Sequence, residues 1–439
     1  MPRAPSGTYL HSEVETLNRD ELRTRQEESL RRQIERCYAG SALYRATLDR
    51  VGAGPGDVRS LDDLARLPVV TKEELREDQR AHPPFGTFAL ADPADFREVH
   101  PSTGTTGTPV NTIWSARDVD TIAEVTARTL WQFGVRPGDV IQNAFAYGLW
   151  VAGMSCHYAA GRIGCLVVPT GTGVPTQKQI DFLESVGSTV LLATPSYGLH
   201  IAEALRERGI DPRGLPLRRG CFGGEAGAEN PATRAKLEAG LGIDAFDYYG
   251  LAEVGPTFAS ECEAKAGLHF AEDYAVVECL DPETREPVAE GELGVLVFTH
   301  LTREATPVLR YWSNDYARLT TERCACGRTH ARAAGGVVGR HDDLVVFKGA
   351  KFYPSQVEKV VRSFPELTDE FRIEVRRAGG LVEACTVVAE LAVAEPAGLD
   401  ERVVRALREE LGVTPALRLD PYGTLERTTF KARRIVEPA

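Results

Sequence analysis

The sequence predicts a large α/β domain with parallel-rich sheets, followed by a small α+β domain. Short apolar runs alternate with helical stretches between residues 140 and 222, and the pattern changes after Gly335-Gly336. Strand and helix patterns in alternation are typical of βαβ units and of a mostly parallel sheet. The length of 439 residues is sufficient for roughly two to three domains.

The N-terminal part combines one helical region with a loop-rich region. Residues 13–50 carry apolar side chains at helical spacing between charged positions. Residues 51–95 are expected to be loop-rich, because Pro55, Pro68, Pro83 and Pro84 interrupt them. Residues 118–133 then predict a helix that Asp118 opens as its N-cap.

The middle of the chain supplies the strands of the large domain. Four apolar runs predict buried strands: Val140–Phe145, Cys165–Pro169, Thr189–Ala193 and Arg219–Phe222. Residues 176–186 and 196–208 predict helices between them. Residues 274–319 differ, because Val276–Leu280 and Gly294–Thr299 predict antiparallel strands joined by Pro, Gly and Glu turns.

A second domain is predicted after Gly335-Gly336. In order, the pattern predicts a strand at 344–347, a helix at 354–363, strands at 372–376 and 385–391, and a helix at 399–411. This is an α+β unit of roughly a hundred residues. We place the boundary so that the two domains span residues 1–339 and 340–439.

Charge and composition exclude several classes of protein. The net charge of −12, from 63 acidic and 51 basic residues, argues against binding a nucleic-acid backbone. The N-terminus has no apolar signal region, and the chain has no run of 18 uncharged apolar residues. Nine cysteines in so long a chain do not indicate a disulfide scaffold. We therefore expect a cytoplasmic protein with reduced thiols and without a membrane partner.

A loop rich in Gly, Thr and Ser is the first candidate binding motif. It reads Ser102-Thr103-Gly104-Thr105-Thr106-Gly107-Thr108-Pro109. Glycines allow close backbone approach, and amides and hydroxyls donate hydrogen bonds to an anion. The spacing is not that of a Walker A loop. On composition alone, an ordinary turn is the commoner interpretation.

This loop resembles the Ser/Thr-Gly-Thr-Thr-Gly-x-Pro signature of adenylate-forming enzymes, and most closely that of the phenylacetate–CoA ligase branch. Other motifs follow in family order along nearly the whole chain. They are Glu15-Thr16-Leu17 with Leu22 and Gln26, Tyr147-Gly148-Leu149-Trp150, His157-Tyr158, Thr194-Pro195-Ser196-Tyr197, Tyr249-Gly250-Leu251-Ala252-Glu253, Arg310-Tyr311 with Asp315, Gly339-Arg340-His341-Asp342-Asp343 and Pro354-Ser355-Gln356-Val357-Glu358. The ordered set is far more specific than any one motif.

The resemblance implies an adenylate-forming N-terminal domain with a small β-barrel-like subdomain, and a mobile C-terminal lid domain. It also implies an AMP-forming acid–thiol ligase. Such an enzyme activates a carboxylic acid, here an aromatic one, as an acyl-adenylate and then forms a thioester with CoA. It must hold ATP, neutralise developing negative charge and exclude water.

The same resemblance implies roles for residues around ATP. Ser102, Thr103, Gly104, Thr105, Thr106 and Gly107 would hold the β- and γ-phosphates. Gly223, Gly224 and Glu225 would form a turn beside the adenine, Tyr249 would stack on it, and Tyr248 would also belong to the nucleotide-binding set. Glu253 would ligate Mg²⁺, which prefers oxygen ligands. Asp315 would accept both ribose hydroxyls, and Arg340 would contact ribose or phosphate.

Three residues of the C-terminal domain receive roles in the same way. Lys431 matches the family's catalytic lysine, which bridges the carboxylate and the α-phosphate during adenylation. Asp342 matches the hinge residue, and Gly349 would lie by the pantetheine tunnel of CoA. The alternatives are a plain interdomain turn and an exposed lysine near a loose terminus.

Cysteine and histidine spacing predicts a zinc site. Cys324 and Cys326 form a Cys-x-Cys pair, and Cys262 and His269 lie upstream. Three Cys and one His are a legitimate tetrahedral zinc shell, and four protein ligands make such a site structural. The alternative is a group of reduced thiols and one imidazole without metal.

The acid would bind near Tyr147, Leu149, Trp150 and Gly153, which occupy the segment that lines the aryl pocket in the family. Core packing of these residues is nearly as plausible. Several positions depart from the family pattern and leave the acid and the acceptor open. They are Thr108, Glu225-Ala226-Gly227, Ala252, Trp312, Asn314 and Phe430.

These departures keep other functions open. One alternative is a biosynthetic relative that passes an amino- or hydroxyaryl acid to a carrier protein, an amine or another nucleophile such as nitrite. An alternative of another class is an inactive nucleotide-binding sensor. Retention of Glu253, Asp315, Arg340 and Lys431 argues against the sensor. Because the family often dimerises, a homodimer is a further expected partner.

Overall fold

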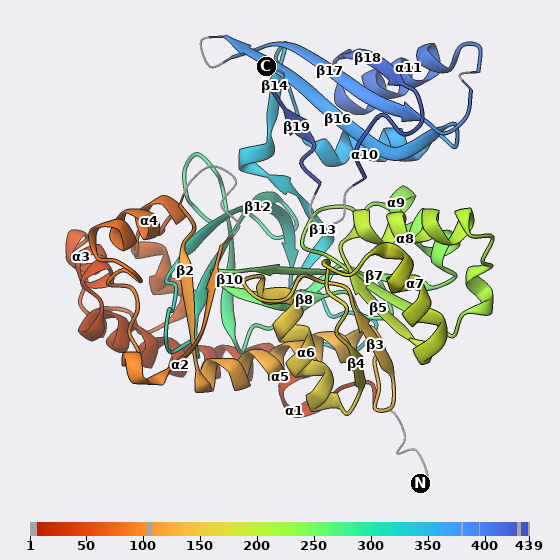
Figure 1. The fold of residues 1–439 in the computed structure, drawn as a ribbon. Coiled ribbons are helices and arrows are strands. Elements are labelled where there is room, and N and C mark those ends of the chain that lie inside the picture. The colour runs from red at the N-terminus through yellow and green to blue at the C-terminus, as the bar shows by residue number, and fades with distance from the viewer. Residues whose placement is uncertain (1–6, 103–107, 379–380, 395, 428–431, 438–439) are drawn as a thin grey trace. The chain divides into compact units, whose positions relative to one another are not determined.

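The computed structural model describes residues 7–102, 108–378, 381–394, 396–427 and 432–437 (Figure 1). The chain divides into two compact units. Unit 1 contains Met1–Gly173 and Asp247–Gly336, and unit 2 contains Val174–Phe246 and Val337–Ala439. Residues 174–246 therefore group with the C-terminal part of the chain. No described helix combines the length and apolarity that crossing a membrane requires.

The helices of unit 1 come mostly from the N-terminal part of the chain. They are α1 (Ser12–Glu15), α2 (Arg19–Gly40), α3 (Ala42–Arg50), α4 (Lys72–Ala81), α5 (Ala116–Gln132) and α6 (Val151–Ile163). Asn18 and Ser41 cap α2 and α3 through hydrogen bonds to backbone N–H groups. Leu22, Leu30 and Ile34 of α2 are fully buried, which confirms the predicted helical periodicity.

Two helix starts in unit 1 correct the sequence expectations. The loop-rich interpretation of 51–95 missed α4, whose Thr71 and Glu74 form a reciprocal capping box. Helix α5 begins at Ala116 and not at 118, because Ser115 is the N-cap and Asp118 is the third helical residue. The Asp118 carboxylate accepts a hydrogen bond from the Ser115 N–H, so Asp118 is the second half of the capping box.

The strands of unit 1 form a hairpin, a parallel pair and a larger, mainly antiparallel array. The hairpin is β1 (Phe96–Pro101) with β2 (Asn111–Ser115), and the parallel pair is β3 (Val140–Asn143) with β4 (Leu166–Val168). The array has the order β10-β11-β12-β13-β9-β8-β7. Its members are β7 (Asp244–Leu251), β8 (Gly255–Ser260), β9 (Leu268–Phe270), β10 (Ala275–Leu280), β11 (Leu293–His300), β12 (Tyr311–Thr320) and β13 (Arg332–Arg340). The predicted antiparallel pairing of β10 with β11 is confirmed.

The first part of unit 2 is a parallel pair with helices. It contains α7 (Thr176–Phe182), β5 (Val190–Ala193), α8 (Pro195–Glu207), β6 (Arg219–Phe222) and α9 (Pro231–Leu241). Strands β5 and β6 pair in parallel, as the alternating pattern predicts. Thr194 caps α8 and Asn230 caps α9, each followed by a proline at the first helical position.

The second part of unit 2 is the predicted α+β region. A sheet of order β15-β14-β17-β16-β19, with β18 beside β17, carries two helices. The elements are β14 (Val345–Phe347), β15 (Ala350–Phe352), α10 (Pro354–Arg362), β16 (Leu367–Ala378), β17 (Leu381–Leu391), α11 (Leu399–Leu411), β18 (Ala416–Asp420) and β19 (Ile435–Val436). Apolar side chains of α10, α11 and the sheet form one core, with Val357, Val361 and Leu407 fully buried.

Candidate active site

The Gly/Thr loop belongs to the segment that connects β1 to β2. Pro101 pairs with Asn111, and the Ser102 N–H donates to the Val110 carbonyl at 2.8 Å. The Val110 N–H in turn donates to Ser102 Oγ at 3.0 Å, and Ser102 is buried. Thr103, Gly104, Thr105, Thr106 and Gly107 lie outside the described residues. The hairpin therefore fixes both ends of the predicted phosphate loop.

Helix α4 contacts the residues that lead from the loop into β2, and the two elements are neighbours in Figure 1. Arg76 Nε donates to the Thr108 carbonyl at 3.0 Å. Gln79 Nε2 donates to the Pro109 carbonyl at 3.0 Å, and Gln79 Oε1 accepts the Asn111 N–H at 2.8 Å. Gln79 is buried, so these bonds are shielded from water.

The same helix contacts the predicted magnesium ligand. Lys72, the first residue of α4, places Nζ 2.9 Å from Oε1 of Glu253. Only 3% of Glu253 is exposed, and a buried carboxylate is stable only beside a partner of opposite charge. Sequence reasoning missed Lys72. The Thr71-Lys72-Glu73-Glu74 capping-box pattern marks the helix that carries it, but not its contact with residue 253.

Tyr249 and Asp315 come together on neighbouring parts of unit 1. The Tyr249 hydroxyl donates to Asp315 Oδ2 at 2.6 Å, and Asp315 is 2% exposed. The Tyr249 ring lies beside the rings of Phe258 and Phe298, at centroid distances of 5.7 and 6.2 Å. Tyr248 points to the other face of β7 and packs edge-on against Phe145. Tyr249 is thus the ring beside Asp315, and Tyr248 belongs to the core.

The Arg310-Tyr311 motif has a structural role. Arg310 forms a two-pronged ion pair with Glu278, with its Nη2 2.8 Å from Glu278 Oε1. Its backbone carbonyl accepts the Val70 N–H at 2.9 Å, and its side chain also donates to the Leu67 carbonyl. Burial raises the pKa of Glu278, and Arg310 opposes this rise. The motif joins the 65–70 segment to the antiparallel array.

The predicted acid-pocket residues have mixed surroundings. The Tyr147 hydroxyl accepts from Asn143 Nδ2 at 2.8 Å and lies 3.3 Å from His157 Nδ1. Burial raises the pKa of Tyr147, so its phenol stays protonated at neutral pH. Leu149 is 63% exposed, and Trp150 is half-buried at the start of α6. Packing alone requires glycine at 153, because a Cβ there would lie 2.4 Å from the Ala146 carbonyl oxygen.

In unit 2, Glu225 connects the predicted adenine turn to the backbone at Ala432. Its Oε1 accepts the Ser196 N–H at 2.9 Å, and its Oε2 accepts the Ala432 N–H at 2.7 Å. Gly224 adopts a φ of +86°, a conformation that favours glycine, and Gly223 is buried. Lys431 lies outside the described residues, but its neighbour Ala432 is held at this turn.

The predicted hinge and tunnel residues lie on exposed backbone of unit 2. Arg340 Nη2 lies 3.5 Å from Asp342 Oδ2, and both side chains are more than a third exposed. An exposed pair of this kind contributes little stability. Gly349 has a φ of +83°, and a Cβ added there would meet open space. The roles of Arg340, Asp342 and Gly349 stay predictions.

Two ion pairs and a hydrogen bond connect helices α8 and α9 to residues after 337 within unit 2. Arg427 Nε lies 3.1 Å from Glu203 Oε2, and Lys236 Nζ lies 2.6 Å from Asp369 Oδ1. Arg362 donates to Thr233 Oγ1 at 2.7 Å and pairs with Glu358. The His200 ring, whose Nδ1 lies 3.8 Å from Glu203 Oε2, and the hydrogen bonds from Arg427 lower the pKa of Glu203 to about 2.

Two carboxylates share one half-buried site beside these pairs. Glu229 accepts the Gly227 N–H at 2.7 Å, and Glu358 accepts from Thr233 and Arg362. Burial and the neighbouring Glu358 raise the pKa of Glu229 to about 7, although Arg362 and the Gly227 N–H oppose this. A raised carboxyl pKa favours folding below the unfolded value near 4.5, and this contribution is lost as pH rises through 7.

A Glu229→Gln variant is therefore expected to gain stability relative to the parent as pH rises. We expect a gain of about 1–3 kcal/mol between pH 5 and pH 8, because glutamine cannot ionise. Thermal melting of both proteins at the two pH values measures the difference. An equal difference in melting temperature at both pH values would contradict the shared-site interpretation.

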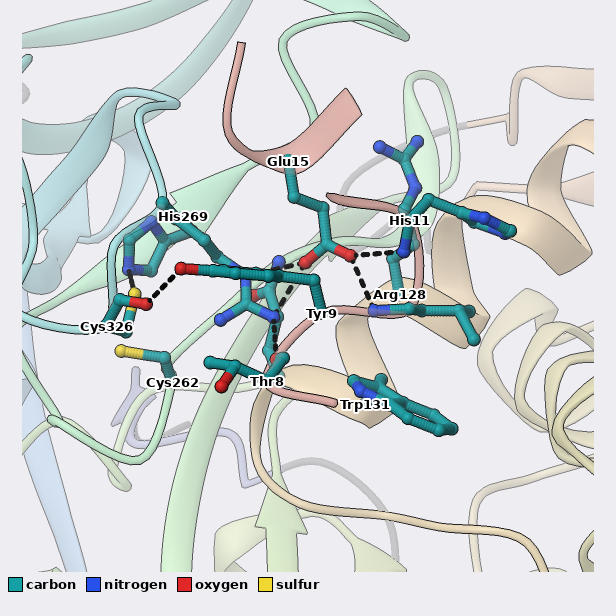
Figure 2. A network of polar contacts seen from close by, with 12 residues as sticks. Thr8, Tyr9, His11, Glu15, Arg128, Trp131, Cys262, His269 and Cys326 are labelled. Carbon is teal, nitrogen blue, oxygen red and sulfur yellow. Dashed lines mark hydrogen bonds and ion pairs between the residues drawn. The ribbon is translucent and has the colours of Figure 1, made fainter. Parts of the chain in front are cut away.

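The four predicted zinc ligands lie together in unit 1. The donor atoms of Cys262, His269, Cys324 and Cys326 all fall within 4.8 Å of one another. Cys262 Sγ and Cys324 Sγ are 3.7 Å apart, and Cys326 Sγ is 3.6 Å from His269 Nε2, as Figure 2 shows for the latter pair. Tetrahedral zinc with bonds of about 2.3 Å to sulfur requires sulfurs about 3.8 Å apart. The donor set and spacing therefore fit zinc.

The thiols of this cluster differ in their proton affinity. A hydrogen bond with Cys326, together with burial, raises the pKa of Cys262. The reciprocal hydrogen bond from Cys262, together with that from His269, lowers the pKa of Cys326. Cys262, His269 and Cys324 are buried, and Cys326 is half-buried. Of the four described ligand residues, Cys326 is therefore the one nearest to bulk water.

Comparison with known proteins gives consistent matches. Residues 26–302 match the family model described as AMP-binding enzyme, and residues 349–438 match the AMP-binding enzyme C-terminal domain. The chain is 39% identical to a phenylacetate-coenzyme A ligase of Thermus thermophilus, over 97% of this chain and 98% of that protein. It is 37% identical to another from Aromatoleum evansii, over 97% and 96%. A crystal structure of 2-hydroxyisobutyryl-CoA ligase in the postadenylation state, in complex with R3-HIB-AMP, superposes with a TM-score of 0.94 at 29% identity, covering 100% of this chain and 94% of that one.

Proposed function

Because the chain belongs to the AMP-binding enzyme family, in the branch of the phenylacetate–coenzyme A ligases, we propose that it activates an aromatic carboxylic acid with ATP and transfers the acyl group to coenzyme A. The structural observation that best supports this proposal is that helix α4 contacts both the residues after the phosphate loop and Glu253. A nucleotide-activating site needs both parts near the same phosphates.

The reaction proceeds in two steps. A carboxylate oxygen attacks the α-phosphorus of ATP, the bond to the β-phosphate bridging oxygen breaks, and pyrophosphate leaves. The thiolate of coenzyme A then attacks the carbonyl carbon of the acyl-adenylate, and AMP leaves. Both steps build up negative charge on oxygen, so fixed cations and N–H donors lower their barriers.

Residues of unit 1 support the nucleotide part of this proposal. Tyr249 presents a ring, and Asp315 a buried carboxylate that can accept from two hydroxyls. Glu253 is a hard oxygen donor whose charge Lys72 neutralises, and we assign it to Mg²⁺. When bound, Mg²⁺ supplies charge neutralisation at the phosphate oxygens. Lys72 would then be a second cation beside the carboxylate that we assign to Mg²⁺.

Residues of unit 2 support the catalytic role of the C-terminal segment. The Glu225 carboxylate accepts hydrogen bonds from the N–H groups of Ser196 and Ala432. It therefore holds the residue that follows Lys431 close to the predicted adenine turn. We assign Lys431 to the α-phosphate and the substrate carboxylate during the first step. Lys431 would then supply a cation at the reacting phosphate, and the phosphate loop would supply N–H and hydroxyl donors.

The decisive experiment is pyrophosphate release from Mg·ATP with a panel of aromatic acids, each with and without coenzyme A. We expect one acid class, with phenylacetate and ring-substituted relatives included, to give release that rises sharply with coenzyme A. Mass spectrometry of the product then identifies the acyl thioester. Release that ignores coenzyme A contradicts the proposed acceptor, and no release with any acid contradicts the enzyme assignment.

We also propose that Cys262, His269, Cys324 and Cys326 hold one structural zinc ion. Three thiolates and one imidazole satisfy its coordination without an open position, which excludes a role in activating water there. Zinc would fix the 324–326 turn against β9, which carries His269.

A Cys324→Ser variant is expected to lose this zinc and to melt at a lower temperature. We expect one zinc per chain in the parent and a melting temperature about 5–10 °C lower in the variant, because metal binding contributes to folding. Elemental analysis and thermal melting measure both. Cys165→Ser, a change at a half-buried thiol outside the cluster, is the control that should keep its zinc. Equal zinc content in the parent and in Cys324→Ser would refute the site.

A further inference from the structure

The chain's N-terminal strap, residues 7–17, lies against the loop that carries two of the predicted zinc ligands. We define this knuckle loop as residues 324–330. Figure 2 shows the Tyr9 hydroxyl of the strap directed toward Cys326, with Thr8 and Glu15 in the same network. The strap contains a single helical turn, α1, and one turn is too short to be stable by itself. Its order must therefore come from contacts with the rest of unit 1.

One contact reaches the peptide of a metal ligand directly. The Tyr9 hydroxyl donates to the backbone carbonyl of Cys326 at 2.8 Å. The next residue, Gly327, has a φ of +89°, and a Cβ there would lie 2.1 Å from the Tyr9 oxygen. Tyr9 thus occupies the space that a side chain at 327 would fill. Its position depends on the backbone conformation of the Cys-x-Cys-Gly turn.

A buried ion pair forms the second contact. Arg328 Nε donates to Glu15 Oε2 at 2.7 Å, and both residues are 2% exposed. Arg328 Nη2 also donates to the Thr8 carbonyl at 3.0 Å, and its guanidinium lies 5.1 Å from the Tyr9 ring centroid. A buried charge pair is stable only when its geometry and hydrogen bonds are complete. Arg328 follows Cys326 by two residues, so the same turn sets its position.

Glu15 connects Arg328 to the backbone of the strap. Its Oε1 accepts the N–H groups of Leu10 and His11 at 2.8 and 2.9 Å. The Thr329 N–H donates to the Glu15 carbonyl at 3.3 Å, and His330 Nε2 lies 3.2 Å from the Val14 carbonyl oxygen. Contacts outside the knuckle loop are fewer, such as Trp131 Nε1 to the Gly7 carbonyl at 3.0 Å. Most polar anchors of the strap therefore come from 326–330.

We infer that metal binding at the four-ligand cluster controls whether the N-terminal strap is ordered on unit 1. This inference rests on the proposed zinc site. Ligation of Cys324 and Cys326 fixes both ends of the tight turn, whose internal bond is the Gly327 N–H to the Cys324 carbonyl at 2.9 Å. Without metal, the turn can relax, and the Cys326 carbonyl and Arg328 lose the positions that hold Tyr9 and Glu15.

Hydrogen exchange by mass spectrometry on the full chain tests this inference. Peptides that cover 8–17 are compared between protein holding one zinc per chain and the same protein after chelation, with zinc measured in each sample. We expect exchange in the strap to rise about ten-fold on metal removal and to recover when zinc is added back. Peptides from α9 in unit 2 should not change.

A variant that keeps the metal separates the strap from general loss of folding. Tyr9→Phe removes only the hydroxyl that reaches Cys326, so we expect faster exchange at 8–17 with full zinc content. Tyr38→Phe removes a comparable tyrosine hydroxyl bond, to Asp49 on the surface, and should leave the strap unchanged.

The outcomes separate the two proposals. Zinc loss without a change in strap exchange overturns this inference and leaves the zinc site intact. Protein that takes up no zinc, either as isolated or after addition of zinc, overturns the zinc site and this inference with it. Equal strap exchange in the parent, Tyr9→Phe and Tyr38→Phe also overturns the proposed coupling.

Discussion

Replacing Lys431 with alanine is expected to lower the rate of acyl-adenylate formation by roughly a hundred- to a thousand-fold. The lysine cation is proposed to bridge the carboxylate and the α-phosphate only while the first step proceeds. The second step, starting from preformed acyl-adenylate and coenzyme A, should therefore keep most of its rate. Pyrophosphate release measures the first step, and thioester formation from added acyl-adenylate measures the second.

Arg433→Ala is the matched control for Lys431→Ala. Arg433 is an exposed cation two residues along the same segment, so its removal changes the net charge equally. We expect this variant to form acyl-adenylate at close to the parental rate. Equal losses in both steps for Lys431→Ala would contradict the specific role and point to a structural defect.

Replacing Glu253 with glutamine is expected to have the second-largest effect. The amide keeps the size of the carboxylate but removes its charge, so affinity for Mg²⁺ falls and Lys72 loses its anionic partner at 2.9 Å. We expect adenylation to fall by about a hundred-fold at ordinary Mg²⁺ concentrations, with partial recovery at high Mg²⁺. Initial rates across a Mg²⁺ titration measure both effects.

Glu283→Gln is the control for this change, because Glu283 is an exposed acid in the turn after β10. It should show the parental dependence on Mg²⁺. A Glu253→Gln variant whose rate loss does not vary with Mg²⁺ would assign Glu253 to positioning of Lys72 instead of to the metal.

Elements with strong local patterns could be predicted from the sequence. The apolar runs at β3, β4, β5 and β6 and the helical spacing at α11 match the structure closely. The family was also predicted correctly, because its motifs are spread along the whole chain. The matches to the AMP-binding enzyme model and to the phenylacetate-CoA ligases confirm it.

Contacts between distant segments were much harder to predict. The four ligand residues were identified because Cys and His in a Cys-x-Cys-Gly context are rare and chemically specific. Lysine is common on protein surfaces, so nothing in the sequence marks Lys72 as the partner of Glu253. In the same way, no local pattern joins Glu15 to Arg328, more than three hundred residues away.

The domain boundary placed between 339 and 340 stays a prediction. The compact units divide close to it, at 336 and 337, but unit 2 also takes in residues 174–246. Within unit 2, Glu203 of α8 and Lys236 of α9 form ion pairs with the C-terminal segment, and Thr233 of α9 accepts a hydrogen bond from it. Charges at these positions give no periodic signal in the sequence.

These pairs bear on how such enzymes can be recombined. A crossover at residue 339 that exchanges only the C-terminal segment separates Arg427 from Glu203 and Asp369 from Lys236. The protein that supplies α8 and α9 must then carry charges that complement the new C-terminal segment, or the hybrid loses these ion pairs. Exchange of residues 174–246 together with 337–439 keeps the pairs as one inherited block. For this chain, two further crossovers flanking α7–α9, besides the one at 336/337, keep these contacts within one parent.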